Sequence, residues 1–538
     1  MKLWFRNRFT VKKTTESREW RTENSILKFI SSNLDNNGRL TTEADNLPDE
    51  NEDGEQLKFA PGLMDAMFGI EDSADSPKRV DELANLLKKI ADRGDKSSEQ
   101  EFYRLITEND NVISIIDNFL QSIVRKSLSI EPYLFSFAKD LTTRSDQRNA
   151  VKFGIAILGL CQNKSALDSL KILGLHDEFT VYSTIAIANL SDNPVHDLWH
   201  LAEKVNGWGK IQLVKRLATM DIDQPIKDWL IREGYKNSIM YEYLAYTCAL
   251  HGELHEKLQQ PQIDQKLFRS TADLLEALIT EASPAEDISA YTHAAPVIEN
   301  FIRHGRQHAG NIADFNALHR LKDFLSELQN DPEACRHNGW NENLIAHCLT
   351  GIGDILNSKD WKTLVYEDLK SPDSVIYWNA KQAAKQLGID LWETVWHKLQ
   401  ANPADPSAWF DVTYNSKTEH VGQVIDFAIR HLPLDELASG PEDSLRLGAT
   451  YIKHNCLDTV ITYLEDYPGQ GEKIILTGLK SPVTRNRNMT IRVLNKWKRE
   501  NWSPQIEKEL THLKDIEPNK ETREDIQKLL NGEGKLII

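Results

Sequence analysis

The sequence lacks the segments that would place it in a membrane or an oxidising compartment. Its 538 residues contain no run of about 18 uncharged apolar residues, which a membrane-spanning helix requires. The basic start of the chain has no apolar stretch of about 7–15 residues like that of a signal peptide. The cysteines contain no C-x-x-C pair, which predicts buried thiols at Cys161, Cys248, Cys335, Cys348 and Cys456. These absences predict a cytoplasmic protein.

Positive charge is also scarce. The chain has 64 Lys and Arg against 81 Asp and Glu, so its formal net charge is −17. Such an excess of negative charge repels phosphate backbones and anionic lipid, so we predict that the protein binds neither nucleic acid nor membranes. The most basic run, KVNGWGKIQLVKR at 204–216, has the apolar period of a helix, and we interpret it as an ordinary helix face.

Motifs for catalysis and cofactor binding are missing as well. There is no P-loop and no G-x-S-x-G serine, and GIGDIL at 351–356 lacks the third glycine of a dinucleotide-binding motif. Three histidine pairs have the i, i+4 spacing that puts two possible metal ligands on one helix face: His196/His200, His251/His255 and His304/His308. Among sixteen histidines such pairs are expected by chance. Residue spacing therefore predicts no metal site and no cofactor site.

What the sequence does contain is a helical pattern from about residue 77 to 530. Segments such as DELANLLKKIAD at 81–92 place apolar residues at i, i+3, i+4 and i+7. A polar cap followed by proline marks predicted helix starts at Ser76, Asn193, Ser283, Asp331, Ser371, Ser481 and Ser503. Glu286 follows Ser283 at the spacing of a capping box. The pattern predicts an all-α fold.

The chain also resembles itself. The string LKSP occurs at 369–372 and at 479–482, and in both copies small or apolar residues follow at the same spacing; 170–190 is a weaker third copy. A helix pair cannot bury its own apolar side and must stack on the next pair. We therefore predict an α-solenoid of stacked HEAT- or armadillo-like helix pairs. Chance recurrence of a four-residue cap is the alternative.

Composition divides the chain into five segments. Residues 1–57 form a polar, partly disordered segment that ends in an acidic linker, with seven Asp and Glu from Glu43 to Glu55. Residues 58–76 are apolar and turn-rich, which predicts a short docking segment. Two helical arrays follow, an N-terminal one at 77–340 and a tryptophan-rich one at 341–532, and residues 533–538 form a tail.

The tryptophans suggest one candidate binding site. Eight of the thirteen tryptophans lie between Trp340 and Trp502. Their bulk can fill wide gaps between stacked helices, which is the interpretation we favour. Alternatively, Trp392, Trp396 and Trp409 line a cavity for an apolar ligand.

A second candidate is the string SPVTRNRNMTIR at 481–492. It places Arg485, Asn486, Arg487 and Asn488 at a predicted helix start, where the helix dipole disfavours a cation. One explanation is pairing with acids of a neighbouring repeat, such as Asp443, Asp458 or Glu472. The other is recognition of an anionic group on a partner. We favour the first.

Longer strings carry a resemblance to a known family. They are FAPGLMDAMFG (59–69), AAKQLGIDLW (383–392), LPLDELASGP (432–441), CLDTVITYLEDYPGQGEKIILTGLKSPVTRNRNM (456–489) and LNKWKRENWSP (494–504). Together they resemble a bacterial family of long helical proteins, some of whose members carry the name limonene hydroxylase. The resemblance covers residues 58–532.

This resemblance implies oxidation of the monoterpene limonene to carveol and perillyl alcohol. It also implies dehydrogenation of these alcohols to carvone and perillyl aldehyde, with NAD(P)H as the expected cofactor. No catalytic residues can be carried over from the family. The competing hypothesis is a non-enzymatic helical-repeat scaffold that binds a protein partner on its concave face.

Overall fold

The computed structural model describes residues 20–50, 61–62, 76–108, 113–125, 132–331, 339–444 and 451–533. These residues form helices, turns and two isolated β-bridges, which confirms the all-α prediction for this part of the chain. None of their helices is apolar and long enough to cross a membrane. Several predicted features lie outside the described residues. They are most of the docking segment, the acidic linker from residue 51, Pro332 of the predicted helix start at Asp331, Cys335, and the tail from 534.

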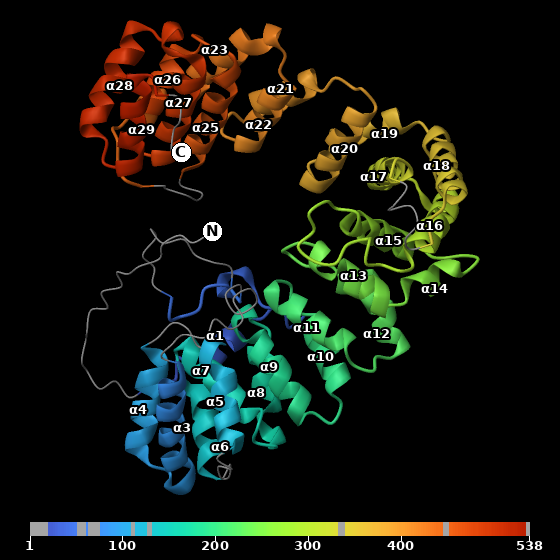
Figure 1. Ribbon diagram of the computed structural model, residues 1–538, viewed down its shortest axis with the longest axis vertical. Coiled ribbons are helices and arrows are strands. Elements are labelled where there is room, and N and C mark those ends of the chain that lie inside the picture. Colours follow the sequence, from blue (N-terminus) through green and yellow to red (C-terminus); the bar gives the residue numbers. More distant parts are fainter. Residues whose placement is uncertain are drawn as a thin grey trace. The chain divides into compact units, whose positions relative to one another are not determined.

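The chain divides into two compact units, with the boundary between Lys359 and Asp360. Figure 1 labels the helices of both units. The α-helices of unit 1 are α1 Ile26–Ser32, α3 Ser76–Arg93, α4 Lys96–Thr107, α5 Ile113–Arg125, α6 Tyr133–Arg144, α7 Arg148–Leu158, α8 Leu167–Leu173, α9 Asp177–Leu190, α10 Pro194–Ala202, α11 Trp208–Ala218, α12 Gln224–Trp229, α13 Glu242–His251, α14 Leu254–Gln259, α15 Gln265–Leu278, α16 Ala294–His308, α17 Ile312–Gln329 and α18 Glu342–Asn357. Those of unit 2 are α19 Trp361–Asp368, α20 Ser374–Gln386, α21 Trp392–Ala401, α22 Pro406–Asn415, α23 Val421–His431, α24 Leu434–Leu437, α25 Ile452–Tyr463, α26 Glu472–Leu479, α27 Thr484–Trp497, α28 Pro504–Ile516 and α29 Lys520–Asn531.

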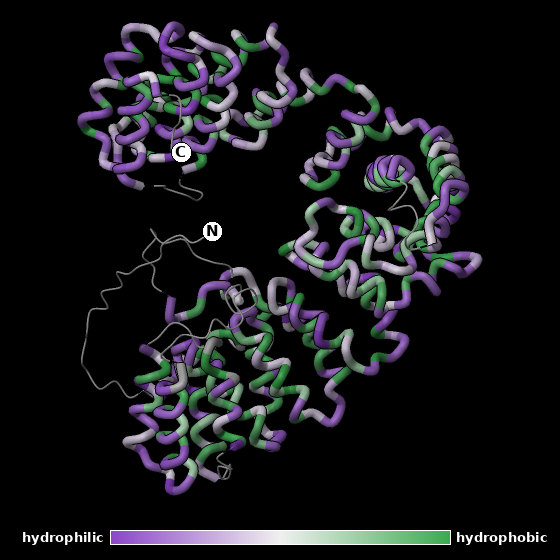
Figure 2. Tube along the Cα trace, viewed as in Figure 1, coloured by the Kyte–Doolittle hydropathy of each residue, from purple (hydrophilic) through white to green (hydrophobic). Residues whose placement is uncertain are grey.

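Helices of unit 1 pack on their second neighbours along the chain. Helix α9 lies between α7 and α11, and the series continues through α13 and α15 to α17. The intervening helices form a second row: α8 and α10 pack on α9, and α16 packs on α14, α15 and α18. Apolar residues lie mainly on the helix sides that face one another (Figure 2). Each helix thus buries its apolar side against helices close in sequence.

Unit 2 repeats this alternation. Helices α22, α25, α27 and α29 pack in series, while α26 packs on α25, α27 and α28. The two LKSP strings form matching turns, in which Ser371 Oγ accepts the N–H of Asp373 at 3.1 Å and Ser481 Oγ accepts that of Val483 at 3.2 Å. Because these hydroxyls cap the turn, α20 and α27 begin after the prolines, at Ser374 and Thr484.

The predicted helix starts differ in outcome. Ser503 and Asn193 are N-caps followed by proline, as predicted. The prediction of a helix and capping box at Ser283 is wrong, because residues 283–290 form turns and Ser283 Oγ accepts the N–H of Ala285, at 3.3 Å. Asp287 Oδ1 accepts the N–H of Ser289 at 2.8 Å, and this side-chain turn competes with a helical backbone.

Residues 20–50, which the sequence assigned to a polar segment, belong to unit 1 and pack against its helices. The ring of Trp20 stacks on Tyr103 with centroids 4.8 Å apart, and α1 packs on α6 and α8. Arg148 bonds the Asp49 carboxylate at 3.0 Å and that of Glu50 at 2.9 Å. A seven-residue helix is too short to give a periodic signal, so its apolar residues were not recognised from the sequence.

Candidate functional site: a basic groove in unit 1

A cavity of about 680 Å³ lies in unit 1 between the N-terminal segment and the starts of several helices. It is lined by Arg39, Leu40, Glu203, Lys204, Val205, Asn206, Lys210, Trp229, Glu233, Lys236 and Lys266. We call its five cations, Arg39, Lys204, Lys210, Lys236 and Lys266, the basic groove. Its volume is in the range of about 300–1,000 Å³ that is usual for small-molecule sites.

A tight turn carries Arg39 into this groove. Asp35 accepts the backbone N–H groups of Asn37 and Arg39, both at 2.8 Å, and Gly38 has the positive φ of 68° that the turn requires. Arg39 Nη2 in turn donates to the Glu203 carbonyl at 3.2 Å. The N-terminal segment is thereby joined to the loop between α10 and α11.

The start of α11 places Lys210 at the bottom of the groove. Asp177, the first residue of α9, accepts the Gly209 N–H at 3.2 Å. Cβ atoms at 207 and 209 would collide with this carboxylate, so only glycines allow α9 and α11 to approach this closely. Lys210 is the third residue of α11, and its Nζ donates to the Glu233 carbonyl at 3.2 Å.

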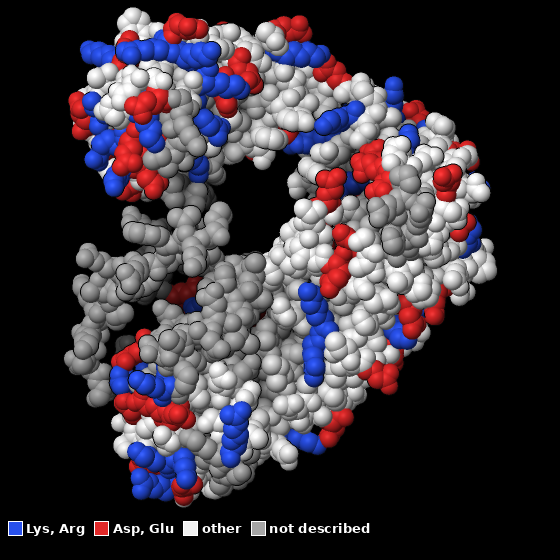
Figure 3. Space-filling view, viewed as in Figure 1, with Lys and Arg blue, Asp and Glu red and all other residues white. Residues whose placement is uncertain are grey.

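Acids balance only part of the charge in the groove. The Glu233 carboxylate pairs with Lys266 at 2.6 Å and with Lys236 at 3.1 Å. In the described part of the chain, no carboxylate oxygen lies within 4 Å of a side-chain nitrogen of Arg39, Lys204 or Lys210. On the face drawn in Figure 3, by contrast, Lys and Arg are interspersed with Asp and Glu. A local cation excess of this kind attracts anions.

Two neighbouring cavities extend the groove along a row of helix starts. One of about 410 Å³ shares Lys204 with it and is lined by Asp177 at the start of α9. The other, of about 570 Å³, shares Lys236 and Lys266 and reaches Asn311, the N-cap of α17. The starts of α9, α11, α15 and α17 therefore face these cavities, and their dipoles add partial positive charge.

Asp177 is buried where α9 meets α11. Burial raises the pKa of this carboxyl to about 7, although the backbone N–H groups of Gly209 and Trp208 oppose the shift. Between about pH 4 and pH 7 the folded protein therefore holds a proton that the unfolded chain has released. The stability that this proton contributes is complete at low pH and is lost as the pH rises through 7.

We expect the Asp177→Asn variant to remove this pH dependence. Asparagine keeps an oxygen that can accept the Gly209 N–H but cannot ionise. The free energy of unfolding of the wild type minus that of the variant should fall steadily between about pH 5 and pH 7 and level off above pH 7. Guanidinium unfolding of both proteins at each pH gives this difference. Other titrating groups contribute equally to both proteins, so their contributions cancel. A constant difference would contradict the expectation.

The three candidate tryptophans lie together in unit 2. The ring of Trp392 stacks on His420 at 3.6 Å and on Trp396 at 5.3 Å, and Phe427 lies beside both Trp396 and Trp409. Trp409 is completely buried, and its Nε1 donates to the Pro403 carbonyl at 2.9 Å. These rings are packed against other side chains.

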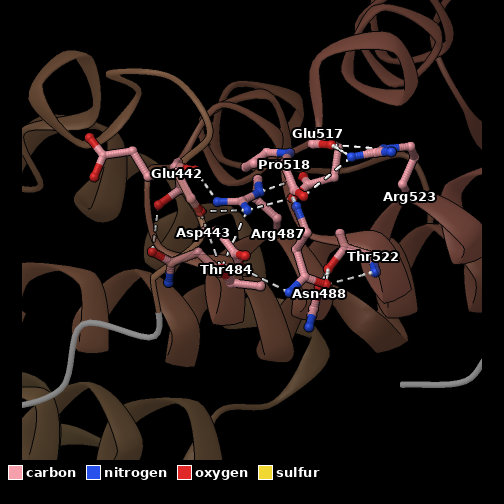
Figure 4. Close-up of polar contacts among 12 residues, drawn as sticks. Glu442, Asp443, Thr484, Arg487, Asn488, Glu517, Pro518, Thr522 and Arg523 are labelled. Carbon is pink, nitrogen blue, oxygen red and sulfur yellow. Dashed lines mark hydrogen bonds and ion pairs between the residues drawn. The ribbon is translucent and has the colours of Figure 1, made fainter. Parts of the chain in front are cut away.

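Arg487 is enclosed within unit 2 and fully buried (Figure 4). Its Nε and Nη2 each donate to Glu517 at 2.7 Å, while its remaining N–H groups reach the carbonyls of Ser481, Pro482 and Glu442. Asn488 accepts the Thr522 hydroxyl at 2.8 Å. Every donor of this guanidinium is therefore occupied within the unit.

Arg485 and Asn486 bind a common acid. Both donate to Asp458, one of the three acids that the sequence suggested. Asn486 is fully buried and also accepts the Ser481 hydroxyl at 2.7 Å. The other two acids lie elsewhere: Asp443 accepts from Asn519, and Glu472 accepts from Ser503. This network joins α25 to α27.

The histidine pairs have separate partners. His196 lies 3.2 Å from Asp223, and His200 lies 3.1 Å from Glu203. His255 stacks on His293, and His304 Nε2 lies 3.0 Å from the Leu258 carbonyl. Within the described residues no group of three His, Cys, Asp or Glu side chains is placed to hold a metal ion. The four described cysteines are buried free thiols.

No protein-family model matches the chain, and no curated protein sequence matches it. The basic groove was not predicted from the sequence, although one signal for it was present. The basic run at 204–216 contains Lys204 and Lys210, which the helical period assigned to an ordinary helix face. Its other cations come from distant parts of the chain, so their proximity depends on the fold.

Proposed function

We propose that this protein is a non-enzymatic α-helical repeat scaffold of the HEAT or armadillo kind. Support comes from the alternate packing of helices in both units, because each helix covers its second neighbour in the chain. The matching turns at Ser371 and Ser481 support repeat ancestry. Buried free thiols support a cytoplasmic location for this scaffold.

The proposed partner is a protein that places an acidic segment in the basic groove. The observation that carries this proposal is the set of three cations, Arg39, Lys204 and Lys210, which have no carboxylate partner among the described residues, in a chain of net charge −17. Connected cavities along the helix starts suit an extended segment better than a compact one. An acidic peptide is favoured over nucleic acid because the long phosphate backbone would be repelled outside the groove.

A fluorescein-labelled peptide of alternating Glu and Gly is a direct probe of this proposal. We expect fluorescence anisotropy to show binding that weakens with added salt. The variant with Lys204→Glu and Lys266→Glu should bind at least about tenfold more weakly, since each reversal replaces attraction by repulsion at the site. The matched control carries Lys88→Glu and Lys89→Glu on α3, which changes the net charge equally away from the groove. Equal losses in both variants would contradict a specific site.

Oxidation of limonene is a second candidate function, supported by the family resemblance alone. The proposed reaction uses NAD(P)H and yields carveol and perillyl alcohol. It is tested by incubating the purified protein with limonene, oxygen and NADH or NADPH, followed by gas chromatography. Product formation in proportion to protein concentration, with an absorbance spectrum or metal content that identifies a cofactor, would establish it and overturn the non-enzymatic proposal.

A further inference from the structure

Lys210 differs from the other cations of the groove in its surroundings. Its side chain is buried, with 7% of the residue exposed, whereas Arg39, Lys204 and Lys266 are exposed. Nζ donates to the Glu233 carbonyl and lies 5.6 Å from the ring centroid of Trp229. The amine is therefore held by an uncharged acceptor and an aromatic ring at the wall of a cavity.

These surroundings favour the uncharged amine. Burial lowers the pKa of Lys210 to about 8, the nearby Cys248 and Glu233 oppose this shift, and Arg39 and Lys236 add to it. The Glu233 carboxylate is itself bound by Lys236 and Lys266. At pH 7, one unit below this pKa, about a tenth of the amine therefore has a free electron pair, which is the requirement for a lysine nucleophile.

We propose that Lys210 is a reactive amine that forms an imine with an aldehyde or ketone carrying an anionic group such as phosphate. The nitrogen attacks the carbonyl carbon, and a C–N bond forms as the carbonyl electron pair moves to oxygen. The oxygen then leaves as water, with protons taken from the amine and the solvent. The imine forms without an oxidant or a reductant.

The groove provides separate places for the two ends of such a molecule. Lys266 lies on α15, Lys204 on the turn after α10 and Arg39 on the N-terminal turn, all around the same cavity. An anionic group can therefore bind to these cations while the carbonyl reaches Lys210. Trp229 supplies a half-buried flat wall against which a planar ligand can stack. The volume of about 680 Å³ accommodates a small molecule.

Pyridoxal 5′-phosphate is a suitable probe, because it combines an aromatic aldehyde with a phosphate. The full-length protein is incubated with limiting probe and then treated with borohydride, which reduces any imine to a stable secondary amine. Peptide mass spectrometry then gives the extent of labelling at each lysine. We expect Lys210 to be labelled at least about tenfold faster than Lys215, which lies on the same helix and lines none of the three cavities described above.

Two comparisons distinguish a specific binding site at Lys210 from the general reactivity of lysines. Inorganic phosphate should suppress labelling of Lys210 but not of Lys215, and pyridoxal without phosphate should label Lys210 at least about tenfold more slowly. The rate at Lys210 should rise with a midpoint near pH 8, while that at exposed lysines continues to rise above pH 9. Lys210→Met should abolish this labelling, and Lys215→Met should not. Labelling of Lys210 no faster than that of Lys215, or insensitive to phosphate, overturns the proposal.

Imine formation at Lys210 is distinct from the scaffold function, and different experiments test the two. The peptide-binding experiment depends on charge reversal at the exposed Lys204 and Lys266, whereas labelling reports the buried amine in the unaltered chain. Peptide binding without Lys210 labelling would support the scaffold proposal and contradict imine formation at Lys210. Lys210 labelling without peptide binding would support a small-molecule site at Lys210 and contradict the proposed acidic partner.

Discussion

Replacing Arg487 with methionine is expected to lower the free energy of unfolding by about 3–5 kcal/mol. Both Arg487 and Glu517 are buried, and the guanidinium binds both carboxylate oxygens at 2.7 Å. Methionine fills similar space but leaves the carboxylate in a low-dielectric interior, where the Asn519 N–H, at 3.0 Å, is its one remaining donor among the described residues. This is more costly than the loss of an exposed pair. Guanidinium unfolding followed by circular dichroism measures the change.

Arg485→Met is the matched control for this variant. Arg485 lies on the same helix and pairs with Asp458, but its side chain is 26% exposed, so water compensates part of the lost interaction. The buried Asp458 also keeps the side-chain N–H of Asn486 when Arg485 is replaced. We expect a loss below about 1.5 kcal/mol. The double variant Arg487→Met with Glu517→Leu should recover much of the stability, because no charge then remains buried. Equal losses for Arg485→Met and Arg487→Met would contradict the special role of burial.

Short-range signals explain which parts of the fold could be predicted. Ser503 followed by Pro504 gives a helix start because the cap and the proline act within one turn. The same pair of residue types at Ser283 and Pro284 gives no helix, since the Asp287 side chain stabilises a competing turn and the Ile288 N–H donates to the Leu278 carbonyl at the end of α15. A cap pattern is therefore informative only where no other local bond competes.

Partners distant in the chain were harder to predict. The sequence identified Arg485 and Arg487 as cations at a helix start, where the helix dipole disfavours them unless a partner compensates. It also suggested Asp458 among the possible acidic partners. Glu517 was not suggested, because it follows α28 and reaches Arg487 only when α28 and α29 pack on their neighbours. The basic groove depends on tertiary packing in the same way, since its cations come from five places: the N-terminal turn, the turn after α10, α11, the segment before α13, and α15.

Replacing Trp409 with alanine is expected to destabilise the protein by about 3–5 kcal/mol, the usual cost of truncating a large buried aromatic side chain. Trp409 is fully buried beside Phe427, and its indole N–H is the donor to the Pro403 carbonyl. Trp378→Ala is the control, because that ring is 46% exposed on α20 and its loss should change stability by less than about 1 kcal/mol. If the tryptophans instead formed an open cavity for an apolar ligand, Trp409→Ala would leave the unfolding midpoint near that of Trp378→Ala. Chemical unfolding of both variants therefore distinguishes a packing role from a ligand-lining role, and the buried Trp392, with 7% exposure, should behave like Trp409.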